Sequence, residues 1–75
     1  MIEELEQVVL AVDLPEHRLK AGDVGTVVLV HGQRGYEVEF VSLDGATVPV
    51  VSLEPAQGRR AAPGAIPHAR PVEAA

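Results

Sequence analysis

The chain alternates between short apolar segments of strand length and polar turns. The continuous apolar run Val8–Val12 predicts a first strand that is buried on both faces, and the β-branched run Val24–His31 predicts a second. Two later segments, Ala46–Leu53 and Gly58–Ala61, predict a fourth strand and a short closing strand. Pro49 has no N–H to donate, so the fourth strand is expected to be at a sheet edge or bulged at that point.

The third predicted strand, Tyr36–Val41, has the clearest pattern in the chain. Apolar and acidic residues alternate along it, and side chains two positions apart share one face of a strand. We therefore expect the core-facing side chains to be those of Tyr36, Val38 and Phe40. Glu37 and Glu39 are expected to lie together on the opposite, solvated face.

Glycine marks the expected turns and one unusual strand position. Gly22 and Asp23 belong to a polar turn before the second strand, where glycine can take the positive φ that other residues avoid. Gly25, inside that strand, predicts a bend, a bulge or a close backbone approach. Asp44 and Gly45 predict a tight hairpin turn between the third and fourth strands.

The longest expected connection is Asp13–Ala21. Leu14 precedes a proline, which favours extended backbone there, and Leu14 and Leu19 are expected to fold back onto the core. Asp13 is expected to cap the turn around Pro15 through backbone amides.

Length and composition indicate one small domain. We expect a folded domain over residues 1–61 and a mobile, Pro- and Ala-rich tail over 62–75. A chain of 75 residues buries only ~60% of the surface that it exposes when unfolded, and aromatic residues make up 3% of it. The absence of cysteine excludes disulfides, a thiol nucleophile and cysteine zinc sites. With an acidic N-terminus and no apolar run near ~20 residues, we expect a cytoplasmic protein without a membrane partner.

Charge is distributed unevenly along the chain. Three cationic side chains and ten carboxylates give −7 through Gly58, whereas the residues from Arg59 onward carry +2. Nucleic-acid binding usually requires a basic surface, so the acidic domain argues against it.

Several polar groups are candidates for chemistry, and each has a simpler explanation. Asp13, Glu16 and His17 lie within five positions and suggest a metal or acid–base site, but a solvated loop accounts for the same residues. Glu37 and Glu39 would lie ~7 Å apart, near the spacing in glycosidases, but the domain is too small to form a sugar cleft. We therefore expect no catalysis, no metal and no cofactor.

The remaining basic groups have weaker patterns. Arg59 and Arg60 could bind an anion but are typical of a solvated domain end, His31 closes the second strand, and His68 is isolated in the tail.

The stretch from Glu4 to about Arg60 resembles a small bacterial family, domain of unknown function 4926. The resemblance rests on ordered motifs: Asp13-Leu14-Pro15-Glu16, Gly22-Asp23-Val24-Gly25-Thr26-Val27, Tyr36-Glu37-Val38-Glu39-Phe40 and Leu43-Asp44-Gly45. Two positions depart from the family pattern. Arg18 stands where glycine is frequent, and Gly58 stands where an aliphatic residue is expected.

The resemblance implies no reaction. Members are small stand-alone proteins, often encoded beside toxin-like genes, so it suggests an immunity or antitoxin role. The Gly22–Val30 run also resembles the KOW element of ribosomal and transcription proteins. We expect an all-β, SH3-like barrel of about five strands with a flexible C-terminal tail.

The expected role is a non-catalytic protein-binding module. Glu37 and Glu39, together with Glu16 and His17 of the long loop, would dock a basic or mixed partner surface. Edge strands could pair with a partner strand or with a second copy to form a homodimer. Two alternatives stay open: a KOW-like nucleic-acid or ribosome-associated module, and an enzyme accessory subunit similar to the SH3-like part of the nitrile hydratase β subunit.

Overall fold

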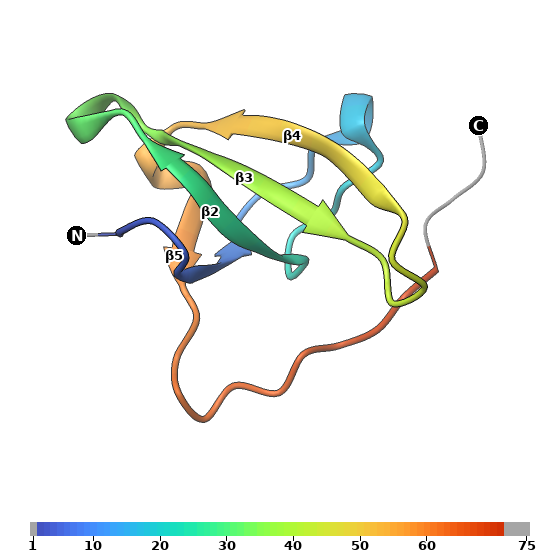
Figure 1. Ribbon diagram of the computed structural model, residues 1–75. Helices are drawn as coiled ribbons and strands as arrows, with labels where there is room; N and C mark the ends of the chain where they lie inside the picture. The colour runs from blue at the N-terminus through green and yellow to red at the C-terminus, as the bar shows by residue number, and fades with distance from the viewer. Residues whose placement is uncertain (1, 72–75) are drawn as a thin grey trace.

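The computed structural model describes residues 2–71, apart from the side chains of residues 47–49, and folds them around one antiparallel sheet (Figure 1). The strand order is β4-β3-β2-β1-β5. The strands are β1 Gln7–Leu10, β2 Val24–Val30, β3 Tyr36–Val41, β4 Thr47–Leu53 and β5 Gly58–Arg60. Three short 3₁₀ helices connect them: η1 Pro15–His17, η2 Gly32–Arg34 and η3 Pro55–Gln57. The predicted all-β class with five strands is confirmed.

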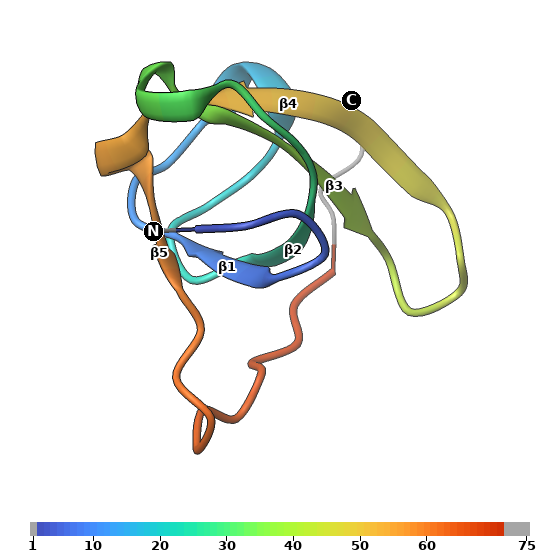
Figure 2. The same ribbon diagram turned by 60° about the vertical axis from the view of Figure 1, so that its left-hand side comes forward.

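The sheet is rolled rather than flat, as Figure 2 shows. β4 and β5 lie at opposite edges, and across a flat sheet they would be ~19 Å apart. Only Glu54 and η3 lie between them; an extended residue adds about 3.3 Å and three 3₁₀ residues rise about 6 Å, which together fall short of this distance. The sheet must therefore curl to bring its edges together, and η1 contacts β4 across this curve. The likeness to an SH3-like barrel remains a prediction.

The core lies on the concave side of the rolled sheet. The alternation predicted for β3 is confirmed, since Tyr36, Val38 and Phe40 are buried and the two glutamates between them are partly exposed. Aliphatic side chains from β1, β2, β4 and the long loop complete the core: Val8, Leu10, Leu14, Leu19, Val27, Val51 and Leu53. Leu14 and Leu19 fold back onto the core as expected and form an isolated bridge with each other.

The first strand is shorter than the apolar run that predicts it. β1 ends at Leu10, and Val12 is exposed, so the prediction of a buried strand through Val12 was wrong. Pairing with β2 ends at Val9 and pairing with β5 ends at Leu10. Ala11 and Val12 therefore have no paired strand beside them against which their side chains could be buried.

Gly25 is a point of close approach between β2 and β3. A Cβ at this position would lie 2.4 Å from Val38 Cγ1 and 3.0 Å from the Glu39 carbonyl oxygen. Of the three explanations expected for this glycine, the structure therefore shows a close approach. The register irregularity of β2 occurs further along, between Val27 and Leu29.

Pro49 satisfies both conditions expected for a proline in a strand. β4 is an edge strand, and its register with β3 shifts between the pairs Val38↔Val51 and Phe40↔Val48. The shift places one extra β4 residue opposite β3, so the missing N–H interrupts no regular ladder there.

The hairpin between β3 and β4 is the tight turn that the sequence predicts. Gly45 has φ +88° and donates its N–H to the Ser42 carbonyl at 2.9 Å. The Ser42 hydroxyl and the Ala46 amide both donate to the Asp44 carboxylate and hold its pKa below the ordinary value. Asp44 therefore fastens the turn through its ionised side chain.

Candidate functional site

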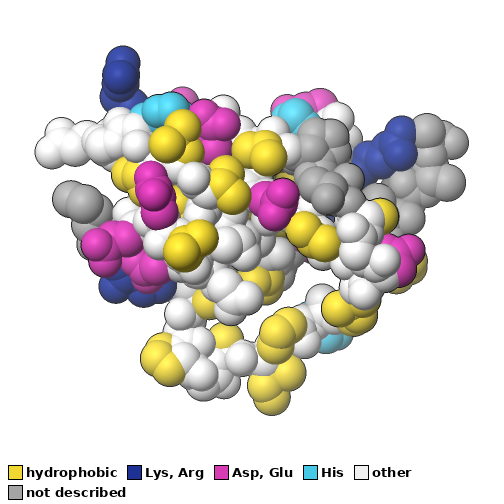
Figure 3. Space-filling model, viewed as in Figure 1, with side chains coloured by type: hydrophobic (Ala, Val, Ile, Leu, Met, Phe, Trp, Pro, Cys, Tyr) yellow, Lys and Arg dark blue, Asp and Glu magenta, His cyan; other side chains and the backbone are white. Residues whose placement is uncertain are grey.

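The convex side of β2, β3 and β4 carries a mixture of acidic and aliphatic side chains (Figure 3). We call this set the outer face: Val28, Leu29, Glu37, Glu39, Val41 and Val50. Its four aliphatic side chains are between 40% and 50% exposed. Half-exposed aliphatic groups around two carboxylates form a surface with both apolar and anionic character.

The local backbone explains why two consecutive residues of β2 are exposed. Val27 pairs with Val38 and faces the core, whereas Leu29 pairs with Glu37 and shares its outward side. The irregularity between these pairs inserts Val28 as an extra residue. A bulge breaks the strict inward–outward alternation, so Val28 and Leu29 are both exposed.

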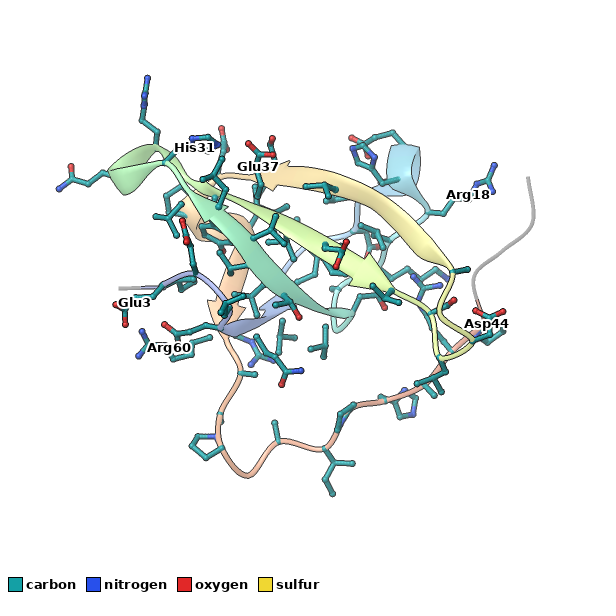
Figure 4. All side chains as sticks on the ribbon, viewed as in Figure 1. Glu3, Arg18, His31, Glu37, Asp44 and Arg60 are labelled. Atoms are coloured by element: carbon teal, nitrogen blue, oxygen red, sulfur yellow. The ribbon has the colours of Figure 1, made fainter. Side chains whose placement is uncertain are left out.

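The two glutamates have different electrostatic surroundings. His31 lies just after β2, and its Nε2 is 2.7 Å from Glu37 Oε2, with the two side chains pointing toward each other in Figure 4. The Glu39 carboxylate has no hydrogen-bond or ion-pair partner within residues 2–71. The sequence interpretation of His31 as a simple strand end missed its pairing with Glu37. The spacing of six residues across a turn is the signal that could have found it.

The loop candidates Glu16 and His17 lie apart from these glutamates. Both belong to η1, which contacts β4, whereas Glu37 and Glu39 lie on β3. In the described part of the chain, no hydrogen bond or ion pair joins the two sets. A partner would have to extend across β4 to reach both.

The acidic loop residues do not converge on a cation. Asp13 Oδ1 accepts the N–H of Ala21 at 2.9 Å, so it holds the far end of the loop. The expectation that Asp13 caps the turn around Pro15 was therefore wrong, because the loop folds back and brings the Ala21 amide closer. No group of three His, Asp or Glu side chains suited to a metal ion occurs among residues 2–71.

The basic residues at the end of the domain have different roles. Arg60 Nε is 2.6 Å from Glu6 Oε2, and the pair joins β5 to the segment before β1. Arg59 is also exposed on β5. The description of a simple solvated domain end therefore misses the contact of Arg60 with Glu6.

Within residues 62–71, one side chain of the tail returns to the long loop. Arg70 Nη2 lies 2.5 Å from Asp23 Oδ2, and both side chains are partly buried. The sequence pattern indicates only a turn at Asp23 and gives no signal for a contact of Arg70. No pattern in the sequence relates these two positions, which are 47 residues apart.

An open depression of about 350 Å³ lies between the His31–Tyr36 segment and the end of β4. Tyr36 lies in its wall, and its hydroxyl is buried without a hydrogen-bond partner among residues 2–71. Burial raises the pKa of the Tyr36 phenol above its ordinary value of 10.0. A phenol that holds its proton this firmly is a poor general base at neutral pH.

The sequence of this five-stranded domain matches a family model over most of its length. The family model described as Domain of unknown function (DUF4926) matches residues 4–59. The chain belongs to DUF4926. The match covers η1, the Gly25 approach, β3 and the Asp44 turn, and it ends inside β5, so the DUF4926 region excludes Arg70 and the tail.

No curated protein and no solved structure matches the chain. In the described part of the DUF4926 chain, no helix has the length and apolar character needed to cross a bilayer.

Proposed function

We propose that this domain is a non-catalytic protein-binding module that docks a basic partner on the outer face. One observation carries the proposal: Glu37 and Glu39 lie among four aliphatic side chains that are 40% to 50% exposed. Apolar groups that stay exposed around fixed charges are typical of interaction surfaces.

The charge of the surface defines the partner. The chain through Gly58 carries −7, and the unpartnered Glu39 lies centrally on β3. A lysine or arginine flanked by apolar residues would pair with Glu39 and cover Val28 and Val41. Complementary charge would speed association and orient the partner, while apolar burial would supply most of the affinity.

The loop candidates extend the same proposal. A partner that covers β3 and crosses β4 would meet Glu16 and His17 on η1, which contacts β4. If the partner is a toxin, the module acts as an immunity protein or antitoxin. If it is an enzyme, the module acts as an accessory subunit.

The test is a tagged pull-down from the native host at moderate salt, with nuclease treatment and mass spectrometry. The variant Glu37→Lys/Glu39→Lys should lose a stoichiometric protein that the wild type retains. The control Glu3→Lys/Glu4→Lys changes the net charge equally in the segment before β1 and should retain it. Circular dichroism and thermal melting must show that both variants are folded.

Two results would contradict the proposal. One is recovery of only ribosomal or nucleic-acid material that disappears with nuclease. This result would favour a KOW-like module, whose binding to nucleic acid should weaken steeply with added salt. The other is equal loss of the partner in both charge-reversal variants, because net charge and not the outer face would then determine binding.

A further inference from the structure

Arg70 of the tail and Asp23 of the domain form a two-pronged ion pair. Arg70 Nε donates to Asp23 Oδ1 at 2.9 Å, and Nη2 donates to Asp23 Oδ2 at 2.5 Å. Nη2 also donates to the backbone carbonyl of Arg18 at 3.0 Å. The side chains of Arg70 and Asp23 are only 24% and 16% exposed. Such parallel contacts match the planar guanidinium group and are not available to lysine.

The acceptors of this pair are held in place by the domain itself. Asp23 Oδ2 also accepts the N–H of Lys20 at 2.9 Å, and the Asp23 carbonyl accepts the N–H of Leu10 on β1 at 2.8 Å. Arg18 has φ +59°, and its own N–H donates to the Pro15 carbonyl at 3.0 Å. These bonds involve no tail residue, so the carboxylate and the carbonyl are fixed without Arg70.

Arg70 lies at the wall of a small depression. The depression has a volume of about 170 Å³ and is lined by Arg70 and the loop residues Asp13, Pro15, Arg18, Leu19 and Lys20. The loop around it is closed by the Leu14↔Leu19 bridge and by the Asp13–Ala21 hydrogen bond. The loop thus has a concave surface, and Arg70 forms part of its wall beside the fixed acceptors.

Between Ala62 and Pro71, the tail makes little other contact with the domain. Figures 1 and 2 show it leaving β5, swinging away from the sheet and turning back toward the domain. Residues 62–69 are exposed, and Ile66 is 89% exposed. Among the described residues beyond Ala61, Arg70 alone hydrogen-bonds to the domain. One arginine side chain therefore brings an otherwise solvated segment back to the loop.

We propose that the loop Asp13–Asp23 is a binding site for an arginine side chain on an extended peptide, and that Arg70 is its occupant in cis. The site is separate from the outer face and does not depend on the function proposed above. A short tether sets an effective concentration of the order of millimolar. A partner arginine must therefore compete with Arg70, so the tail raises the concentration of partner that is needed to fill this site.

The experiment uses the full chain and a synthetic peptide with the sequence of residues 65–71, followed by amide NMR. In the Arg70→Ala variant, the peptide should shift the Lys20 and Asp23 amides in a saturable way. In the wild type, the occupied site should bind the peptide roughly tenfold more weakly. A peptide with lysine in place of the arginine should bind clearly less well, because lysine cannot form the two-pronged contact.

Two variants make the result decisive. Arg70→Ala/Asp23→Asn keeps an acceptor for the Lys20 amide but removes the charge, and it should not respond to the peptide. Arg70→Lys keeps the tail charge, and without peptide its Lys20 and Asp23 amides should have the NMR shifts of the unoccupied site. This result does not depend on whether the Asp23→Asn variant is stable. The proposal is overturned if the arginine peptide fails to bind Arg70→Ala or binds the wild type with the same affinity. It is also overturned if Arg70→Ala binds the lysine peptide as tightly as the arginine peptide.

Discussion

The Tyr36 hydroxyl occupies the space that a side chain on Gly58 would fill. A Cβ at Gly58 would lie 2.4 Å from the Tyr36 hydroxyl oxygen and 3.5 Å from Cζ of the same ring. Gly58 has φ −141° and ψ 163°, which is ordinary extended backbone, so glycine is required here by space and not by conformation. The phenol of Tyr36 therefore accounts for the glycine at position 58.

Gly58→Ala should destabilise the domain by about 1–3 kcal/mol, because the added methyl overpacks the space beside the phenol. In a Tyr36→Phe background the hydroxyl oxygen is gone, and the nearest ring atom is 3.5 Å away, an ordinary contact distance. The same substitution should then cost less than about 0.5 kcal/mol. Urea unfolding of the four proteins gives the coupling. Equal costs in both backgrounds would show that Gly58 and the hydroxyl do not interact.

Tyr36→Phe alone should raise the free energy of unfolding by about 1 kcal/mol, since it removes a buried hydroxyl without a hydrogen-bond partner. The effect should depend on pH. Burial raises the folded-state pKa above 10.0, so the folded state holds its proton more firmly than the unfolded state. Wild-type stability should therefore fall as the pH rises above 10, and the Phe variant should lack this contribution. Unfolding measured between pH 8 and about 11 checks both parts. A constant difference across that range would contradict the assignment.

The pattern of β3 was sufficient to predict its two faces, because a strict period of two in Tyr36–Val41 admits one arrangement. The apolar run Val8–Val12 was not sufficient to predict its end. An apolar run shows which residues favour burial but not where the neighbouring strands end. β1 ends at Leu10 because neither β2 nor β5 pairs with it beyond that residue.

The candidate site was predictable only in part. Alternation placed Glu37 and Glu39 on one face. The exposure of Val28 beside Leu29 results from a bulge, and a run of β-branched residues predicts a strand but not the position of a bulge in it. The contact of Arg70 with Asp23 depends on the path of the tail in three dimensions. A single sequence carries no periodic signal for a contact between an irregular tail and a loop.

Gly25→Ala should destabilise the domain by about 1–3 kcal/mol, because the methyl would lie 2.4 Å from Val38 Cγ1 and 2.9 Å from Phe40 Cε2. Both of those side chains are buried in the core, so neither can move aside cheaply. Gly64→Ala is the matched control, since no atom lies within 4 Å of the added methyl and φ is not positive. Thermal unfolding should leave Gly64→Ala within about 0.5 kcal/mol of wild type. If both variants lose a similar amount of stability, the close approach at Gly25 is not the cause of the loss.

Arg18 is a non-glycine residue with φ +59° and ψ 30°, at the end of η1. A side chain in this left-handed conformation costs about 1 kcal/mol relative to glycine. Arg18→Gly should therefore stabilise the domain by up to about 1 kcal/mol, the larger entropy of the unfolded glycine chain offsetting part of the gain.

Arg18→Ala is the matched control for the loss of the side chain, because alanine keeps the Cβ and with it the conformational cost. The Arg18 side chain projects away from the domain in Figure 4, so we expect Arg18→Ala to lie within about 0.5 kcal/mol of wild type. Both variants keep the backbone carbonyl that accepts from Arg70. Chemical denaturation compares the three proteins. If alanine stabilises as much as glycine, the arginine side chain and not the positive φ is the source of the cost.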